Sequence, residues 1–235
     1  MGFQLINSGP LFGTKQTATG ACRFWSDYIE AIEVISTHSN LIKDLNDQGF
    51  PVSEVSDLYN KRYNYKLAIP SLIDALEKEH DPILLEEIVR ALSVKWAKPA
   101  AAAPLIKKFI HVDDKNGLGL RWVIANALAV VADDTVYGDL VVYLRNKSFG
   151  RSREMLVLAL SGMKTTCADE ELIGLLNDDD LVGHALIALG KRKVNGARDH
   201  ILRLENHPNS WVRKEAKKAL AKLTSNKEAS SRDTV

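Results

Sequence analysis

The chain of 235 residues is poor in cysteine, with only Cys22 and Cys167, which lie far apart in the sequence. Two cysteines so widely separated cannot form a metal site of the Cys-x-x-Cys type. Lone thiols without a pattern are typical of proteins that stay reduced in the cytosol. The cysteine content therefore predicts a cytoplasmic location.

Long apolar runs and an excess of one charge are also absent. No stretch approaches the roughly 18 apolar residues that a membrane span needs, and residues 1–20 lack the pattern of a secretory signal. Lys plus Arg number 31 and Asp plus Glu number 30, which gives a formal net charge of +1. This balance counts against a protein that coats nucleic acid or an anionic membrane.

Catalytic and metal-binding motifs are missing as well. None of the six histidines has a His or Cys partner at i+3 or i+4, and there is no HExxH, GxSxG or GK[ST] motif. The densest acidic cluster, Asp178 to Asp180, lacks the spacing and the glycine of an EF-hand loop, and acidic residues at the start of a helix are favoured by its dipole. We therefore predict no catalytic residues, no metal site and no cofactor.

What the sequence does contain is an internal repeat from residue 67 onward. Five amphipathic segments each carry an Ala-Leu pair at the same place, and the alanines follow one another at intervals of 36, 32, 29 and 31 residues. Repeats of this length fit a helix pair with two turns. The small Ala allows close approach of neighbouring helices, and the Leu fills the core between repeats. The pairs are Ala91-Leu92, Ala127-Leu128, Ala159-Leu160, Ala188-Leu189 and Ala219-Leu220.

A second amphipathic segment and a short polar turn precede each of these helices, and no window shows the period-2 alternation of a convincing strand. The sequence thus predicts an all-α superhelix of antiparallel helix pairs. We predict four parts: a mobile arm (1–20), an N-terminal helical region stacked on the repeats (21–66), five repeats (67–223) and a disordered tail (224–235). Gly162 and Gly190 fall where two of the second helices are expected to stop.

The repeated segments resemble the HEAT-repeat family, including the short HEAT-like repeats of phycobilisome lyases. The first helices carry a family-like proline at Pro70 and Pro104, and the last repeat has the family's Val-Arg opening at Val212-Arg213. Arg121 and Arg153 match the same arginine position, whereas the first and fourth repeats lack it. The resemblance covers about two-thirds of the chain and implies an elongated scaffold, a fold that hosts many functions.

The repeat arginines allow two interpretations. They could line a groove for an anionic ligand, or they could bond to the acidic turns of their own or the next repeat. We favour the second, structural interpretation, because buried arginines usually have a carboxylate partner.

The slot directly after the repeat arginine holds varied residues, including Gly183, and is therefore expected to face solvent. In a HEAT solenoid the second helices line the concave face, so this slot and the position four residues later should form a stripe there. Trp122 stands among charges in this stripe, which is the composition of a binding hot spot, although packing against a neighbour is an equal alternative. The predicted stripe consists of Glu86, Arg90, Trp122, Asn126, Glu154 and Lys214.

Three functions remain open from the sequence. The first is a non-catalytic scaffold that binds a protein or peptide through its concave face, and we predict this one. The second is a HEAT-like DNA-repair glycosylase or other nucleic-acid-binding protein, which the net charge disfavours. The third is a phycobilin-lyase-like protein, which rests on the repeat type alone. The sequence does not identify the partner or the oligomeric state.

Overall fold

The computed structural model describes residues 38–114 and 119–230, with side chains as far as residue 223. The predicted N-terminal arm and the first part of the predicted N-terminal helical region lie outside the described residues. Residues 38–47 are helical, and the short helix α2 (Asp57–Asn60) follows them.

The predicted all-helical repeat architecture is confirmed. Ten further helices form five antiparallel pairs, and the residues described contain no strand. The β-rich segment Leu140 to Leu144 lies inside a helix, as its repeat position predicts. The pairs are α3 (Ile69–Lys78) with α4 (Pro82–Leu92), α5 (Ala102–His111) with α6 (Leu120–Val131), α7 (Tyr137–Arg145) with α8 (Ser152–Leu160), α9 (Cys167–Gly174) with α10 (Val182–Arg192), and α11 (Arg198–Leu202) with α12 (Ser210–Ser230).

Local sequence signals explain where these helices begin. Asp81 caps α4, because its Oδ1 accepts hydrogen bonds from the backbone amides of Ile83 (3.0 Å) and Leu84 (2.9 Å). Pro82 then occupies the first turn, where its missing N–H costs nothing. Asp114 accepts from the backbone amide of Arg121 (2.9 Å) at the start of α6, so an acidic turn also opens this second helix.

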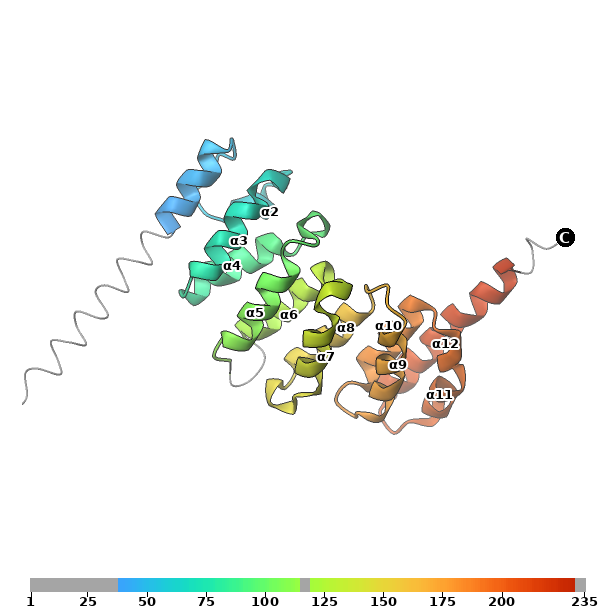
Figure 1. Cartoon of the computed structure of the whole chain (residues 1–235). Helices are drawn as coiled ribbons and strands as arrows, with labels where there is room; N and C mark the ends of the chain where they lie inside the picture. Colours follow the sequence, from blue (N-terminus) through green and yellow to red (C-terminus); the bar gives the residue numbers. More distant parts are fainter. Residues whose placement is uncertain (1–37, 115–118, 231–235) are drawn as a thin grey trace, which may run out of the picture.

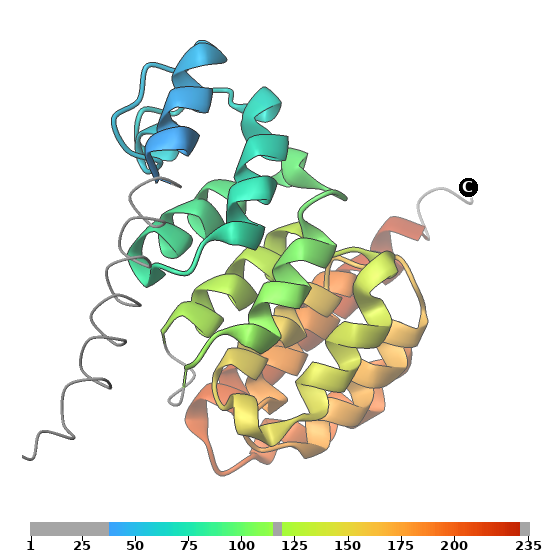
Figure 2. The ribbon, with the colours of Figure 1, turned by 60° about the vertical axis from the view of Figure 1, so that its left-hand side comes forward.

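The pairs follow one another along an elongated rod in chain order (Figure 1), and a turned view shows them stacked face to face (Figure 2). Neighbouring second helices pack on each other without interruption from α4 to α12, whereas among the first helices only α3 and α5 pack closely. The second helices therefore form the more tightly packed layer of the stack. We call their solvent-facing surface the inner face.

The core runs between the pairs and is built on the repeated Ala-Leu motif. The five alanines and five leucines are all buried, which confirms the repeat register. Gly190 lies opposite Ala219, where an added Cβ would stand 3.0 Å from the Ala219 Cα. The absence of a side chain at Gly190 thus lets α10 and α12 approach each other closely.

Two helix ends differ from the predictions. Gly162 follows α8 as expected, but Gly190 does not end α10, which continues to Arg192 and closes on Lys193 in the left-handed conformation. Gly190 therefore serves the close packing of α10 against α12 and does not cap the helix. Helix α12 runs to Ser230, past the predicted start of the tail at residue 224, and residues 231–235 lie outside the described residues.

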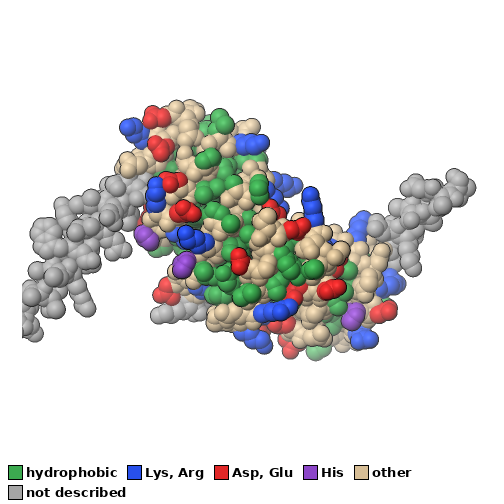
Figure 3. Space-filling model, viewed as in Figure 1, with side chains coloured by type: hydrophobic (Ala, Val, Ile, Leu, Met, Phe, Trp, Pro, Cys, Tyr) green, Lys and Arg blue, Asp and Glu red, His purple; other side chains and the backbone are tan. Residues whose placement is uncertain are grey.

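The outer surface mixes charged and apolar side chains. Hydrophobic side chains gather over α3 and α5 among Lys, Arg, Asp and Glu (Figure 3). Leu67 and Val142 are the most exposed large apolar residues of the first-helix layer, at 77% and 64%. No helix of the described chain is long and apolar enough to cross a membrane.

We predict that Leu128→Ala lowers the free energy of unfolding by about 2–5 kcal/mol, because it leaves a cavity between α6 and α8. Urea denaturation followed by circular dichroism measures this loss. Val142→Ala serves as the control, since that side chain is exposed and its truncation should change stability by less than about 0.5 kcal/mol. Equal midpoints for the two variants would contradict the proposed core.

Candidate partner-binding surface

The repeat arginines are structural, but only Arg153 has the predicted carboxylate partner, whereas Arg121 and Arg213 bind backbone carbonyls. The Arg121 side chain donates from Nε to the Phe109 carbonyl (3.1 Å) and from Nη1 to the Asp114 carbonyl (2.8 Å), and it also donates to the Val112 carbonyl. Its guanidinium lies 5.0 Å from the centroid of the Phe149 ring, a cation–π distance. Each donor thus binds the end of the preceding helix, and the side chain is not free to hold an anion.

Arg153 and Arg213 act in the same way. Arg153 donates to the Leu144 carbonyl (2.7 Å) and to Asp178 Oδ2 (2.6 Å), which joins the third pair to the acidic turn of the fourth. Arg213 Nη1 donates to the carbonyls of His207 (2.7 Å) and Pro208 (2.8 Å). The Arg153 bond also explains Asp178, whose pKa is lowered despite partial burial because the guanidinium and a backbone amide stabilise its charge.

A further arginine of this kind, Arg192, lies at the end of α10, where the repeat pattern does not mark it. Arg192 donates to Asp169 and to the carbonyls of Leu160, Met163 and Thr165, and so binds the loop between α8 and α9. Arg192 does not occupy the repeat-arginine position, so its partners could be identified only from the folded structure.

Three residues of the predicted stripe line one cavity on the inner face. Arg90 comes from α4, whereas Trp122 and Asn126 come from consecutive turns of α6. The cavity has a volume of about 450 Å³. Trp122 is half-buried, so it is neither a core residue nor a freely exposed one. The full lining is Tyr59, Tyr65, Val89, Arg90, Ser93, Val94, Trp122, Val123 and Asn126.

Sequence reasoning missed the far wall of this cavity. Tyr59 lies in α2, and Tyr65 lies in the connection to α3, a segment that was predicted only to join the N-terminal region to the repeats. Tyr65 is held in place because its hydroxyl donates to the Ala91 carbonyl (2.9 Å) and its ring packs edge-on against Trp96. Burial raises the pKa of Tyr65 to about 12. The aromatic character of the segment was the available signal.

The polar groups of the cavity are few and fixed. Glu86 Oε1 accepts from both Nε (2.9 Å) and Nη2 (2.6 Å) of Arg90, so the two charges largely compensate each other. Asn126 Nδ2 donates to the Trp122 carbonyl (3.0 Å), which orients the amide. Among the described residues, neither Asn126 Oδ1 nor the Trp122 indole N–H has a hydrogen-bond partner. Both therefore remain available to a bound molecule.

The structure places Glu154 on α8 in a separate cluster, away from the cavity and in the middle of the rod. Its Oε1 accepts from Arg151 Nε (3.0 Å), and its Oε2 lies 3.8 Å from His184 Nε2 on α10. Trp211 of α12 packs edge-on against His184 and covers Gly183, where an added Cβ would stand 2.0 Å from the indole. The expectation that Gly183 faces solvent was wrong, because the Trp211 ring fills that space.

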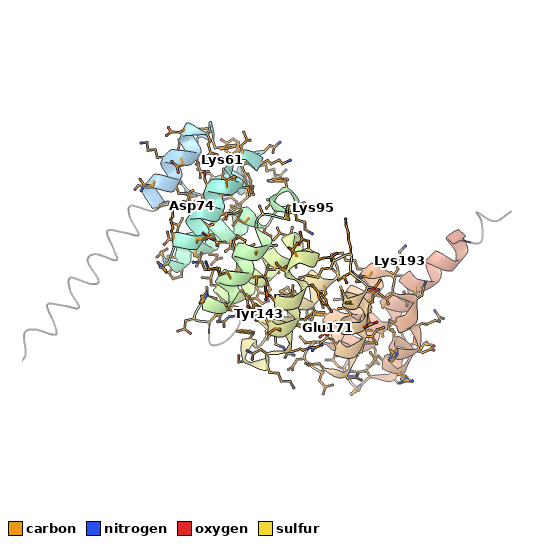
Figure 4. All side chains as sticks on the ribbon, viewed as in Figure 1. Lys61, Asp74, Lys95, Tyr143, Glu171 and Lys193 are labelled. Atoms are coloured by element: carbon orange, nitrogen blue, oxygen red, sulfur yellow. The ribbon has the colours of Figure 1, made fainter. Side chains whose placement is uncertain are left out.

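Lys214 of α12 is exposed beyond this cluster. Between it and the aromatic cavity, the inner face carries partly exposed apolar side chains, among them Val130, Leu158 and Ile187. The stripe predicted from the sequence is thus divided into a cavity at α4 and α6, a paired cluster at Glu154, and a basic end. Lys95 and Lys193, labelled in Figure 4, lie on one edge of the rod, after the ends of second helices.

Chemistry at a metal centre has no support in the described part of the chain. No group of three or more His, Cys, Asp or Glu side chains there is arranged to hold a metal ion. The acidic cluster is used within the fold, because Asp178 binds Arg153 and its Oδ1 accepts from the Asp180 amide (3.0 Å).

No protein-family model matches the chain, and no curated protein sequence does so either. Two solved structures of designed armadillo repeat proteins show a likeness. One, in complex with the peptide (KR)4, is 16% identical, with a TM-score of 0.45 over 79% of this chain and 99% of that one. Another is 17% identical, with a TM-score of 0.41 and the same coverage. Neither likeness bears on function.

We predict that Arg153→Met destabilises the protein by about 3–5 kcal/mol, because it leaves Asp178 and a helix-end carbonyl without their buried partner. Arg145→Met provides a matched control: Arg145 also pairs with a carboxylate, Glu171, but in an exposed position where an ion pair contributes little. Thermal unfolding of both variants measures the contrast. Similar losses of stability in the two variants would show that the burial of Arg153 does not matter to its contribution.

His184 should make stability depend on pH. Burial lowers the pKa of His184 below its ordinary value of about 6.5, although Glu154 raises it in part, and its Nδ1 is buried without a hydrogen-bond partner. The unfolded chain then binds a proton more readily than the folded one. Stability is therefore complete above about pH 6.5 and falls as the pH drops below it.

The measurement compares urea midpoints of the wild type and of His184→Gln between pH 5 and pH 8. We expect the stability of the variant to fall less steeply than that of the wild type below pH 6.5, since glutamine does not titrate there. A decline of the same size in both proteins would assign it to other groups.

Proposed function

We propose that the chain is a non-catalytic scaffold that binds a peptide segment of a partner protein along its inner face. One side chain of the segment enters the cavity between Tyr59 and Trp122. The single observation that carries this proposal is the cavity itself, because it combines aromatic and aliphatic walls with a few oriented polar groups. This composition is the usual one of a recognition pocket.

The free polar groups suit a peptide backbone. Asn126 Oδ1 can accept a hydrogen bond from a backbone N–H, and the Trp122 indole can donate one to a carbonyl. They stand one helical turn apart, as their i, i+4 spacing requires. A segment held in this way gains affinity from its main chain and specificity from the side chain in the pocket.

The inner face gives little support to nucleic-acid binding. Its central helices contribute Arg121 and Arg153, and both side chains are buried within the fold. A polyanion needs a continuous row of accessible cations that can neutralise its phosphates. The DNA-glycosylase alternative therefore has no observation in its favour, and neither does the phycobilin-lyase alternative.

We propose further that the repeats are of the HEAT type and that the protein works in the cytoplasm. The position of Arg121, Arg153 and Arg213 at the start of second helices supports the first point. The free thiol of Cys167 on the surface accords with the second.

Trp122→Ala should abolish recognition while the fold survives. A displayed library of random 12-residue peptides is selected on the wild-type protein, and the affinity of the enriched peptides is measured by fluorescence anisotropy. We expect Trp122→Ala to weaken binding by about thirtyfold or more, as the loss of a hot spot does. Circular dichroism verifies that the variant remains folded.

Val142→Ala on the outer layer is the matched control and should bind as the wild type does. The proposal fails if the library yields no binder, or if Trp122→Ala binds normally. If Trp122→Ala unfolds easily, Asn126→Ala gives the decisive comparison, because it removes the acceptor without opening the core.

A further inference from the structure

The middle of the inner face presents almost no free charge. The only charged residue of α6 is Arg121, which is 8% exposed and held by the carbonyls described above. In α8, Arg153 is buried and Glu154 is paired with Arg151. The accessible side chains here are neutral, including Val123, Leu158 and Asn126 of the central helices. A segment that covers these helices would bury charged side chains at a cost, so its middle should be uncharged.

The end of the inner face at α10 and α12 differs from the middle. Three lysines lie there, at the positions that follow the inner-face stripe from helix to helix: Lys191, Lys214 and Lys218. Their carboxylate partner in the described structure is Glu215, which accepts from Lys218 Nζ (2.7 Å), while Lys191 donates to the neutral hydroxyl of Ser161 (3.0 Å). This end therefore carries an excess of positive charge.

The opposite end, at α4, has the reverse balance. Glu86 and Glu87 lie on α4 against the single cation Arg90, whose guanidinium is bound to Glu86. Glu87 accepts from the Ser56 amide and lies close to Tyr59, whose pKa is raised by burial and, second, by the Glu87 carboxylate. The inner face is thus negative near the aromatic cavity and positive at the far end, with a neutral surface in between.

The spacing of the helices sets the length of a segment that joins these two ends. Packed helices lie about 8–10 Å apart, so the three steps from α6 to α12 span about 24–30 Å. An extended chain advances about 3.3 Å per residue, which corresponds to about seven to nine residues.

We infer that the partner segment is an extended peptide with a large apolar side chain in the cavity, a neutral middle, and a carboxylate about seven to nine residues away that meets Lys214. This inference rests on the proposed function and adds the chemistry and the polarity of the ligand. The favourable charge pairing defines which end of the peptide lies over α12.

The test uses the peptides enriched on the wild-type protein. We expect an Asp or Glu about seven to nine residues from the apolar anchor in most of them. Lys214→Glu should weaken such a peptide about fivefold, and replacing the peptide's acid by Lys should restore binding to that variant. Lys107→Glu is the control, because Lys107 is also exposed but lies on α5 in the outer layer, and it should leave affinity unchanged.

Raising the salt concentration should reduce the effect of Lys214→Glu, because exposed charges are screened. Peptides that depend on Trp122 but carry no acid at this spacing, or that are insensitive to Lys214→Glu, would overturn the inference and leave the proposed function intact. Absence of Trp122-dependent binders would overturn both.

Discussion

The packing of the two central helix pairs depends on buried guanidinium groups. Arg121 and Arg153, near the start of their second helices, reach back to the carbonyls at the end of the preceding helix, and Arg153 also reaches forward to the acidic turn at Asp178. Removing such a charge from water is expensive unless every donor is satisfied. The geometry of the pair is therefore specified narrowly: the two helices and the turn must meet where the donors point.

This constraint determines what the inner face can present. The arginine side chains point into the fold, and the Ala-Leu pairs are buried between helices. The side chains at the outward positions of the second helices therefore do not bind the repeat arginines. They are free to vary, and they do so in an ordered way from acidic, through aromatic and apolar, to basic. The scaffold thus separates the residues that hold it together from those that could recognise a partner.

The exceptions show how closely the helices are fitted. Gly183 stands at an outward position by its repeat slot, yet Trp211 from the next pair covers it, and Gly190 admits the backbone of α12. Arg192 binds a loop from a position that the repeat does not mark. These contacts all cross from one pair to the next.

The sequence by itself determined the helix pairs, their register and the buried alanines and leucines, because these follow from a local period and from spacing along the chain. It also placed Trp122 and Asn126 on one face of α6, and Glu86 and Arg90 on one face of α4, since i, i+4 geometry within a helix is fixed. The sequence could not add Tyr59 and Tyr65 to that group or withdraw Gly183 from it. Those contacts join segments that are distant in the chain, and only the packing of one pair on the next brings such segments together.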